Sequence, residues 1–270
     1  MFIARKRGKL PRGSLTKSKK NRIIKVNSSD FVISQITILT SCEVEDDYMI
    51  KPSSVPFINA NGNSWKNEDI ERTYHTFIGG HNFLEHDQNE KKSYGFIADA
   101  TLKKRSLEDG GYVYDVDLLV ATARRLTPDD SVAEKILKDK SAKFSMGCYS
   151  SSIQCSYCGN VSEQPTDDCV HLSNKLGSTF VTTSGGISEV SAIITPLRKG
   201  DDPDKPTGFI RFIEASIVRD PAYAGAVLGY ILNIDDNRDI YFKIPESQFN
   251  RKSFNGIKHW AKKGLVKIIK

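Results

Sequence analysis

Residues 94–120 read YGFIADATLKKRSLEDGGYVYDVDLLV and contain two runs in which apolar and polar residues alternate. The apolar positions are Tyr94, Phe96, Ala98, Ala100 and Leu102 in the first run and Tyr112, Tyr114, Val116, Leu118 and Val120 in the second. A period of two is typical of a β-strand that presents one face to a core. Asp109, Gly110 and Gly111 lie between the runs and favour a tight turn. The stretch therefore predicts an antiparallel hairpin.

The sequence on either side of this hairpin predicts further strands and a few helices. Strands are expected over residues 31–33, 36–39, 142–153 and 209–218. Helices are expected over residues 67–75, 127–140 and 224–232. In the second helix, Thr127 has the character of an N-cap and Pro128 suits the first helical position. Strands and helices do not alternate regularly, which favours an α+β fold over a doubly wound sheet.

Charge is distributed unevenly along the 270 residues. Residues 1–25 hold ten Lys or Arg and residues 251–270 hold seven, with no acidic residue in either segment. Removing these seventeen charges from the net charge of +6 leaves residues 26–250 at −11. We expect a basic flexible arm over 1–29, a folded domain over 30–233, and a linker with a basic tail over 234–270. The basic ends would suit contact with nucleic acid or an acidic protein surface, or would act only as solvated tails.

Targeting and redox signals are weak. No stretch approaches the ~18 consecutive apolar residues that a membrane span needs, so no membrane contact is expected. The basic N-terminus is not followed by the apolar core of a secretory signal. We therefore expect the protein to fold and act in a reducing cytoplasm. The chain has five cysteines, an odd number, so we do not expect a framework of disulfide bonds.

Two segments carry side chains suited to nucleophilic chemistry. The apolar residues 83–84 are followed by Glu85, His86 and Asp87, which would place an imidazole at the rim of a sheet. Ser145 lies between apolar neighbours, and Gly147 would let a substrate approach the backbone and let N–H groups point at an oxyanion. Either residue alone is also typical of an ordinary surface histidine or strand serine.

A third segment, residues 212–222, places Glu214 on a mostly apolar strand face together with Phe212, Ser216 and Val218. A carboxylate in such a place is costly unless it is paired. A histidine would be a suitable partner, and the carboxylate would hold it in the tautomer that accepts a proton from serine.

A cysteine-rich insert over residues 153–173 predicts a zinc knuckle. Cys155 and Cys158 form a Cys-x-x-Cys turn, and Cys169 and His171 follow ten residues later. Three thiolates and an imidazole make a tetrahedral set that zinc prefers, and four protein ligands leave no open position for catalysis. We therefore expect a structural zinc ion that pins the loop beside Ser145.

Taken in the order His, Ser, Glu, the three segments resemble the prohead maturation proteases of tailed phages, relatives of herpesvirus assemblin. In that family a histidine ends an apolar strand and is commonly followed by Asp, as at residues 86–87. The nucleophile lies in a Ser-x-Gly strand, as at 145–147, and a later Glu-x-Ser-Ile/Leu-Val…Pro-Ala segment matches residues 214–222. The likeness covers roughly residues 75–230, and a subset of the family also has a cysteine-rich segment after the Ser-Met-Gly-Cys strand.

The resemblance implies an assemblin-like β-barrel or sheet core flanked by helices, and a serine endopeptidase that cuts scaffold and capsid proteins. It would act as a homo-oligomer inside the assembling prohead, in the host cytoplasm. Ser145 would attack, His86 would be general base and then general acid, and Glu214 would orient His86. Because assemblin relatives can use a second histidine, His81 is the alternative third member.

Two other functions are compatible with parts of the sequence. One is a capsid or scaffold component that keeps the fold without activity, although His86 and Ser145 are both present. The other is a zinc-stabilised nucleic-acid-binding protein, which the acidic body of the chain disfavours. The resemblance also implies cleavage after a Glu that lies two positions beyond an aliphatic residue, and trimming of the protease by itself. Ile244-Pro245-Glu246 fits that pattern in what the sequence predicts is an exposed linker.

Overall fold

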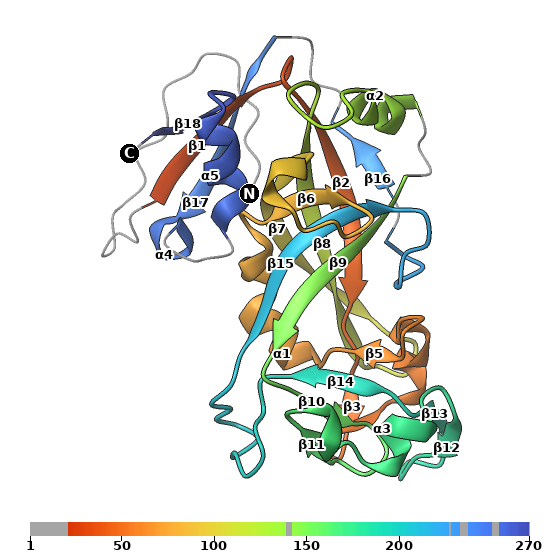
Figure 1. The fold of residues 1–270 in the computed structure, drawn as a ribbon. Helices are drawn as coiled ribbons and strands as arrows, with labels where there is room; N and C mark the ends of the chain where they lie inside the picture. Colours follow the sequence, from red (N-terminus) through yellow and green to blue (C-terminus); the bar gives the residue numbers. More distant parts are fainter. Residues whose placement is uncertain (1–20, 139–141, 227, 233–236, 250–253, 270) are drawn as a thin grey trace.

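A computed structural model describes residues 21–138, 142–226, 228–232, 237–249 and 254–269. Its centre is a seven-stranded sheet with the order β16-β2-β8-β7-β6-β15-β9 (Figure 1). The bounds are β2 Phe31–Thr40, β6 His81–Leu84, β7 Gly95–Ser106, β8 Tyr112–Ala123, β9 Lys143–Ser150, β15 Ile210–Val218 and β16 Leu228–Ile231. The hairpin predicted over residues 94–120 is confirmed as β7 and β8, which pair antiparallel at the middle of this sheet.

The large sheet curls into a half-barrel, so that its two edge strands, β16 and β9, approach each other at one end. The backbone N–H of Phe144, in β9, donates to the carbonyl of Ala226 at 2.8 Å. The N–H of Leu228, in β16, donates to the carbonyl of Ala142 at 3.0 Å. A curled sheet with few helices makes the chain mixed α+β, mostly sheet, as the sequence predicts.

Smaller sheets lie at the two ends of the half-barrel (Figure 1). At one end, β17, β1 and β18 form a sheet with β1 in the middle, and their bounds are β1 Asn21–Asn27, β17 Asp239–Pro245 and β18 Val266–Ile269. At the other end lie β11-β10-β14-β5, β12-β13 and β3-β4. These have the bounds β3 Val44–Glu45, β4 Met49–Ile50, β5 Asn63–Ser64, β10 Ser152–Cys155, β11 Val161–Ser162, β12 Thr179–Val181, β13 Ile187–Glu189 and β14 Ala192–Thr195.

The helices are short. They are α1 Asn67–Thr73, α2 Ser131–Lys138, α3 Val170–Asn174, α4 Glu246–Phe249 and α5 Asn255–Lys262. Turns of 3-10 helix span Pro52–Phe57, Tyr74–Phe77, Glu90–Lys92 and Pro165–Asp167. None of the helices in the described ranges has the length and apolarity that crossing a membrane requires.

The core is formed by the apolar residues of the strands, and in β2 and β8 both faces of the sheet are buried over part of the strand. Phe96 and Val116 in the central hairpin are fully buried. Phe31 packs edge-on against both Phe96 and Trp260, with ring centroids 5.4 and 5.9 Å apart. Trp260 belongs to α5, so the C-terminal segment is part of the same core as the central hairpin.

The domain boundaries expected from charge are wrong at both ends. Residues 21–27 form β1, although they fall in the expected flexible arm; residues 1–20 lie outside the described residues. Residues 239–249 and 255–269 contain the strands β17 and β18 and the helices α4 and α5, although a linker and tail were expected. The basic residues Lys25, Lys243 and Lys267 lie on the more exposed face of the β17-β1-β18 sheet. They alternate along its strands with Val26, Phe242 and Val266, which are buried, so the charge pattern alone resembles that of a solvated tail.

The exposed linker expected around Glu246 is also wrong. Ile244 is buried in β17, and Glu246 begins α4, where its carboxylate accepts from Arg22 at 3.0 Å. A protease takes an extended chain, so cleavage after Glu246 would first require this region to unfold locally.

Two expected helices differ from the structure. The helix expected over 127–140 begins only at Ser131, because Leu126 has a positive φ of 62° and the Asp130 carboxylate accepts from both the N–H and the hydroxyl of Thr127. In the helix expected over 224–232, residues 228–231 instead form the strand β16, which pairs with β2, and residue 227 lies outside the described residues. Gly229 disfavours a helix there, and pairing covers an edge of β2 that would otherwise be open.

The strand expected over 142–153 is divided. β9 ends at Ser150 and β10 begins at Ser152, and the two strands belong to different sheets. The chain therefore passes directly from the half-barrel into the cysteine-rich insert.

Candidate active site and candidate metal centre

A strained turn carries His86. Residues Leu84 to Asp87 form a tight turn in which the N–H of Asp87 donates to the carbonyl of Leu84 at 3.0 Å. Both central residues have positive φ, 48° for Glu85 and 57° for His86. Two positive φ values in succession correspond to a type I′ turn, which is costly for residues other than Gly, Asn and Asp. Such strain persists only where the surroundings enforce it, and it is concentrated at functional sites.

Contacts with β15 hold this turn in place. The N–H of Glu85 donates to the carbonyl of Ile217 at 2.9 Å, which continues the parallel pairing of β6 with β15. The carboxylate of Glu85 accepts from the N–H of Arg219 at 3.1 Å. The turn is therefore fastened to the strand that carries Glu214.

Glu214 lies at the middle of β15 and is completely buried. Its Oε1 is 2.7 Å from Nδ1 of His86, and its Oε2 accepts a hydrogen bond from the hydroxyl of Ser216. A buried carboxylate needs such partners, since an unpaired charge away from water is very unfavourable. The contact between Glu214 and a histidine that the sequence predicts is therefore present.

The pairing sets the electrostatics of His86. The hydrogen bond to Glu214 raises the pKa of His86 above its usual value, and partial burial opposes this shift. Because an ionised carboxylate can only accept, Nδ1 must donate. The neutral imidazole then carries its lone pair on Nε2. The His86 side chain is 41% exposed, whereas that of Glu214 is 1% exposed, so the histidine links a buried charge to the surface.

Ser145 lies in β9, next to this pair. It is the cross-strand register partner of Ser216, two positions along β15 from Glu214. Ser145 and His86 line the same cavity, which has a volume of about 290 Å³. Within the described part of the chain, the Ser145 hydroxyl has no hydrogen bond to His86. Such bonds are often long before substrate binds.

Gly147 has a different role from the one its sequence context predicts. It is not among the glycines with positive φ. A Cβ atom at this position would lie 2.6 Å from Oε1 of Glu214, closer than real Cβ contacts allow. The glycine therefore provides space for the Glu214 carboxylate, and the structure gives no separate sign of an oxyanion role.

His81, the alternative third member, is bonded elsewhere. Its Nδ1 is 2.9 Å from the hydroxyl of Ser93, and its ring stacks on Phe83. Burial lowers the pKa of His81 to about 4, so the ring is neutral at ordinary pH. Although His81 is the register partner of Glu214, the carboxylate hydrogen-bonds His86.

The rest of the cavity wall is uncharged, and apart from residues 146–148 and Ala222 sequence reasoning did not single it out. Besides His86 and Ser145 it consists of Ile38, Leu39, Thr40, Phe57, Asn59, Asn61, Asn63, Trp65, Met146, Gly147, Cys148, Ile194, Ala222 and Tyr223. Asn59 and Asn61 come from the turn before β5 and Asn63 begins β5, and the side-chain oxygen of Asn59 accepts from the N–H groups of Asn61 and Asn63. The repeated asparagine in residues 59–63 was the available signal, but it is equally typical of any turn.

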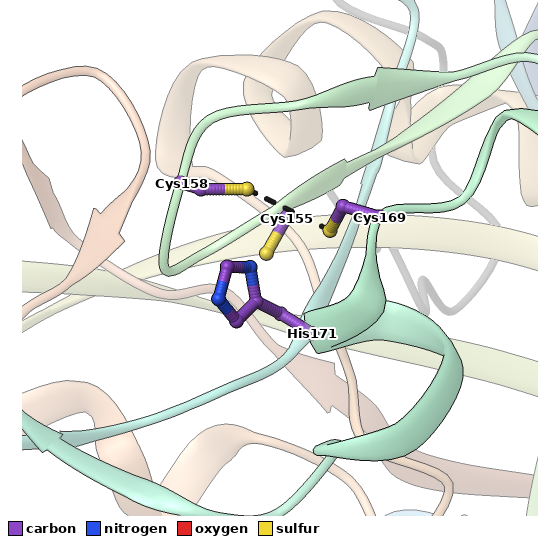
Figure 2. A group of neighbouring side chains, drawn as sticks. All are labelled: Cys155, Cys158, Cys169 and His171. Carbon is purple, nitrogen blue, oxygen red and sulfur yellow. Dashed lines mark hydrogen bonds between the residues drawn. The ribbon is translucent and has the colours of Figure 1, made fainter.

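The predicted metal ligands come together in the insert. The ligand atoms of Cys155, Cys158, Cys169 and His171 all lie within 4.8 Å of one another (Figure 2). Cys155 ends β10, Cys158 follows in the turn, Cys169 immediately precedes α3, and His171 lies in α3. The turn is closed by the N–H of Gly159, which donates to the carbonyl of Cys155 at 3.0 Å.

The donor set fits a metal ion. Sγ of Cys158 and Sγ of Cys169 are 3.6 Å apart, whereas a tetrahedral zinc ion with Zn–S bonds of about 2.3 Å separates its sulfur ligands by about 3.8 Å. Nδ1 of His171 is buried and has no hydrogen-bond partner within the described residues. Burial raises the pKa of the Cys155 thiol to about 12, and a bound cation would oppose this by favouring the thiolate. The cluster can therefore hold a metal ion and is compatible with zinc.

The cluster is connected to the cavity through one small sheet. Cys155 in β10 is the register partner of Ala192 in β14, and Ala192 is the partner of Asn63 in β5. Asn63 and Ile194, from the same two strands, line the cavity. A metal ion that fixes the end of β10 would thus also fix one wall of the cavity.

Comparisons with known protein families, with curated proteins and with solved structures find no match to this chain.

Proposed function

We propose that the chain is a serine endopeptidase of the prohead maturation type, in which Ser145 is the nucleophile, His86 the general base and Glu214 the residue that orients His86. One observation carries the proposal: His86 is hydrogen-bonded at 2.7 Å to a fully buried carboxylate and lines the same cavity as Ser145. The strained turn at His86 supports it, because an outlier of this kind indicates a functional position.

The proposed chemistry is acyl transfer. Nε2 of His86 takes the proton of the Ser145 hydroxyl as Oγ attacks the substrate carbonyl, and the same nitrogen then gives the proton to the leaving amine. The resulting acyl-enzyme is hydrolysed by water, with His86 again acting as base. Glu214 stays ionised throughout and stabilises the imidazolium that forms in each step.

The biological setting follows from the resemblance of the motifs. We assign scaffold and capsid proteins as substrates, the interior of the assembling prohead in the host cytoplasm as the place of action, and a homo-oligomer as the working form. The curled half-barrel is compatible with an assemblin-like core. Zinc is the metal we assign to Cys155, Cys158, Cys169 and His171, in a structural role, because four protein ligands leave no position for a substrate. The basic segments at both ends would contact nucleic acid or acidic scaffold.

The proposal is tested by producing the chain together with its capsid and scaffold proteins and mapping new N-termini by mass spectrometry. We expect new N-termini with the wild-type chain and none with Ser145→Ala or His86→Ala, each of which should remain folded. Cleavage that persists in both variants would remove Ser145 and His86 from the site. Absence of cleavage with the wild-type chain would favour the inactive capsid component that the sequence leaves open.

A further inference from the structure

The Glu214 carboxylate is enclosed so completely that its position depends on very few atoms. Glu214 and Ser216 are both fully buried, so water cannot replace a lost partner. Within the described residues, the carboxylate is hydrogen-bonded by Nδ1 of His86 at Oε1 and by the Ser216 hydroxyl at Oε2. Ser216 therefore satisfies the oxygen that His86 does not reach, and a buried acceptor left without a donor is costly.

The strand register explains why this arrangement forms. Glu214 and Ser216 are two residues apart in β15, so their side chains share one face of the sheet. Their cross-strand partners in β9 are Gly147 and Ser145. The four residues thus form a two-by-two block, in which the Glu-x-Ser segment of one strand lies against the Ser-x-Gly segment of the other.

Gly147 completes the enclosure by having no side chain. The three atoms nearest to a Cβ at this position all belong to Glu214: Oε1 at 2.6 Å, Cγ at 3.1 Å and Cδ at 3.3 Å. Oε1 is the oxygen that contacts His86. Any side chain at position 147 would displace the atom on which the orientation of His86 depends.

We propose that Ser216 and Gly147 are positioning residues that together form a cradle for the Glu214 carboxylate, Ser216 by donating to Oε2 and Gly147 by leaving room for Oε1. The Glu-x-Ser segment of β15 and the Ser-x-Gly segment of β9 then act together, because the glycine of β9 leaves room for the carboxylate of β15. The proposal deepens the proposed function, and it rests on that function only for its kinetic test.

The kinetic test is a pair of double-mutant cycles. Ser216→Ala should lower kcat about tenfold to a hundredfold, as expected for a lost hydrogen bond to a charged group, with KM unchanged. Gly147→Ala should lower kcat at least as much. In the Glu214→Ala background neither change should lower the residual kcat further, because both residues act through the carboxylate. Ser34→Ala is the matched control, since Ser34 is a fully buried strand serine whose hydroxyl has no partner within the described residues.

Equal losses of kcat in the wild-type and Glu214→Ala backgrounds would overturn the cradle, since they would show a role that does not pass through Glu214. A loss of kcat in Ser34→Ala as large as in Ser216→Ala would also overturn it.

A second test does not require activity and so separates failure of the cradle from failure of the proposed function. The hydrogen-bonded Nδ1 proton of His86 should be visible in the proton NMR spectrum of wild type and Ser34→Ala, and should be lost in Ser216→Ala and Gly147→Ala. Gly147→Ala should lower the urea midpoint of the wild-type chain but not of Glu214→Ala, where the carboxylate is gone. An unchanged Nδ1 resonance in both variants, or the same fall in midpoint in both backgrounds, would contradict the cradle even if the chain cuts no protein.

Discussion

His86 and Glu214 form a charge pair that is buried at one end and open at the other. The carboxylate cannot gain solvation anywhere else, so it favours a proton on Nδ1 of His86, and the pKa of His86 is raised as a result. The same contact would make the imidazole a stronger base toward Ser145 and would keep Nε2 available to it.

The first prediction at this scale concerns pH. His86 must be neutral to accept a proton from Ser145, so kcat/KM should rise with pH through a midpoint above 6.5, because the pKa of His86 is raised. Glu214→Gln removes the largest cause of that shift. We expect the midpoint to move down toward 6.5 and kcat to fall by about a hundredfold or more. A pH profile of both proteins measures this, and a midpoint that stays in place in Glu214→Gln would contradict the assigned pairing.

The contribution of His86 to folding stability should fall as pH rises, whereas activity should rise. A raised pKa in the folded state means that protonation of His86 favours folding. The contribution is fully present below pH 6.5 and is lost as pH rises through the raised value. Activity and this part of stability therefore trade against each other across the same pH range.

Several site residues could be predicted from sequence because their chemistry is unusual for their surroundings. Glu214 is a charged residue within an apolar strand, and His86 ends an apolar run. The role of Gly147 could not be predicted, because a glycine that provides space and a glycine that provides backbone freedom look alike in a sequence. Only the cross-strand register shows that its neighbour is Glu214.

At the scale of elements, the cysteine-rich insert packs with residues 190–192 into a second, smaller core beside the half-barrel. Cys155, Leu172, Val190 and Ala192 form its buried cluster. A core of this size is too small to be stable alone, and small domains of this kind depend on a metal. The spacing of the ligands was sufficient to predict the insert because metal coordination is a local, sequence-readable constraint.

We predict one zinc ion per chain, measured by elemental analysis of the purified protein. Cys155→Ser should abolish this stoichiometry, whereas Cys42→Ser, at a buried cysteine outside the cluster, should retain it. Loss of zinc should raise KM more than it lowers kcat, because the sheet that holds Cys155 supplies the cavity wall at Asn63 and Ile194. A metal-free protein with normal stability and normal KM would show the cluster to be incidental.

The alternating strands β7 and β8 and the largely apolar strand β15 could be predicted well, and the shorter elements could not. β16 has two glycines nearby and only four residues, and it becomes a strand because β2 offers an unpaired edge. Helix α2 starts later than predicted because Asp130 binds Thr127 in a turn. The strand β16 is thus determined by a long-range contact, and the start of α2 by a local turn that competes with the helix.

At the scale of the whole molecule, the two ends of the chain form one structure. β1 pairs with both β17 and β18, so the first described residues are held by the last ones. Arg22 bonds to Glu246 across this junction at 3.0 Å. Charge composition does not reveal that these segments are folded, because basic residues and buried apolar residues alternate along the same strands.

We predict that the C-terminal segment stabilises the fold and is not a releasable tail. Trp260 is fully buried in the main core, so Trp260→Ala should lower the free energy of unfolding by about 3–5 kcal/mol. Tyr241→Ala, at a residue that is 50% exposed, should change it by no more than about 0.5 kcal/mol. Urea unfolding of both variants measures this. A Trp260→Ala protein as stable as the wild type would restore the interpretation of residues 247–270 as a detachable tail.

The central claim is that Ser145 is a nucleophile activated by His86 and Glu214, and covalent labelling tests it most directly. The chain is incubated to completion with a fluorophosphonate, and the adduct is located by peptide mass spectrometry. The account predicts one adduct per chain on Ser145, strongly slowed in Glu214→Gln and absent from His86→Ala. An adduct on another residue, no adduct on Ser145 after exhaustive incubation, or equal labelling of wild type and His86→Ala would contradict it.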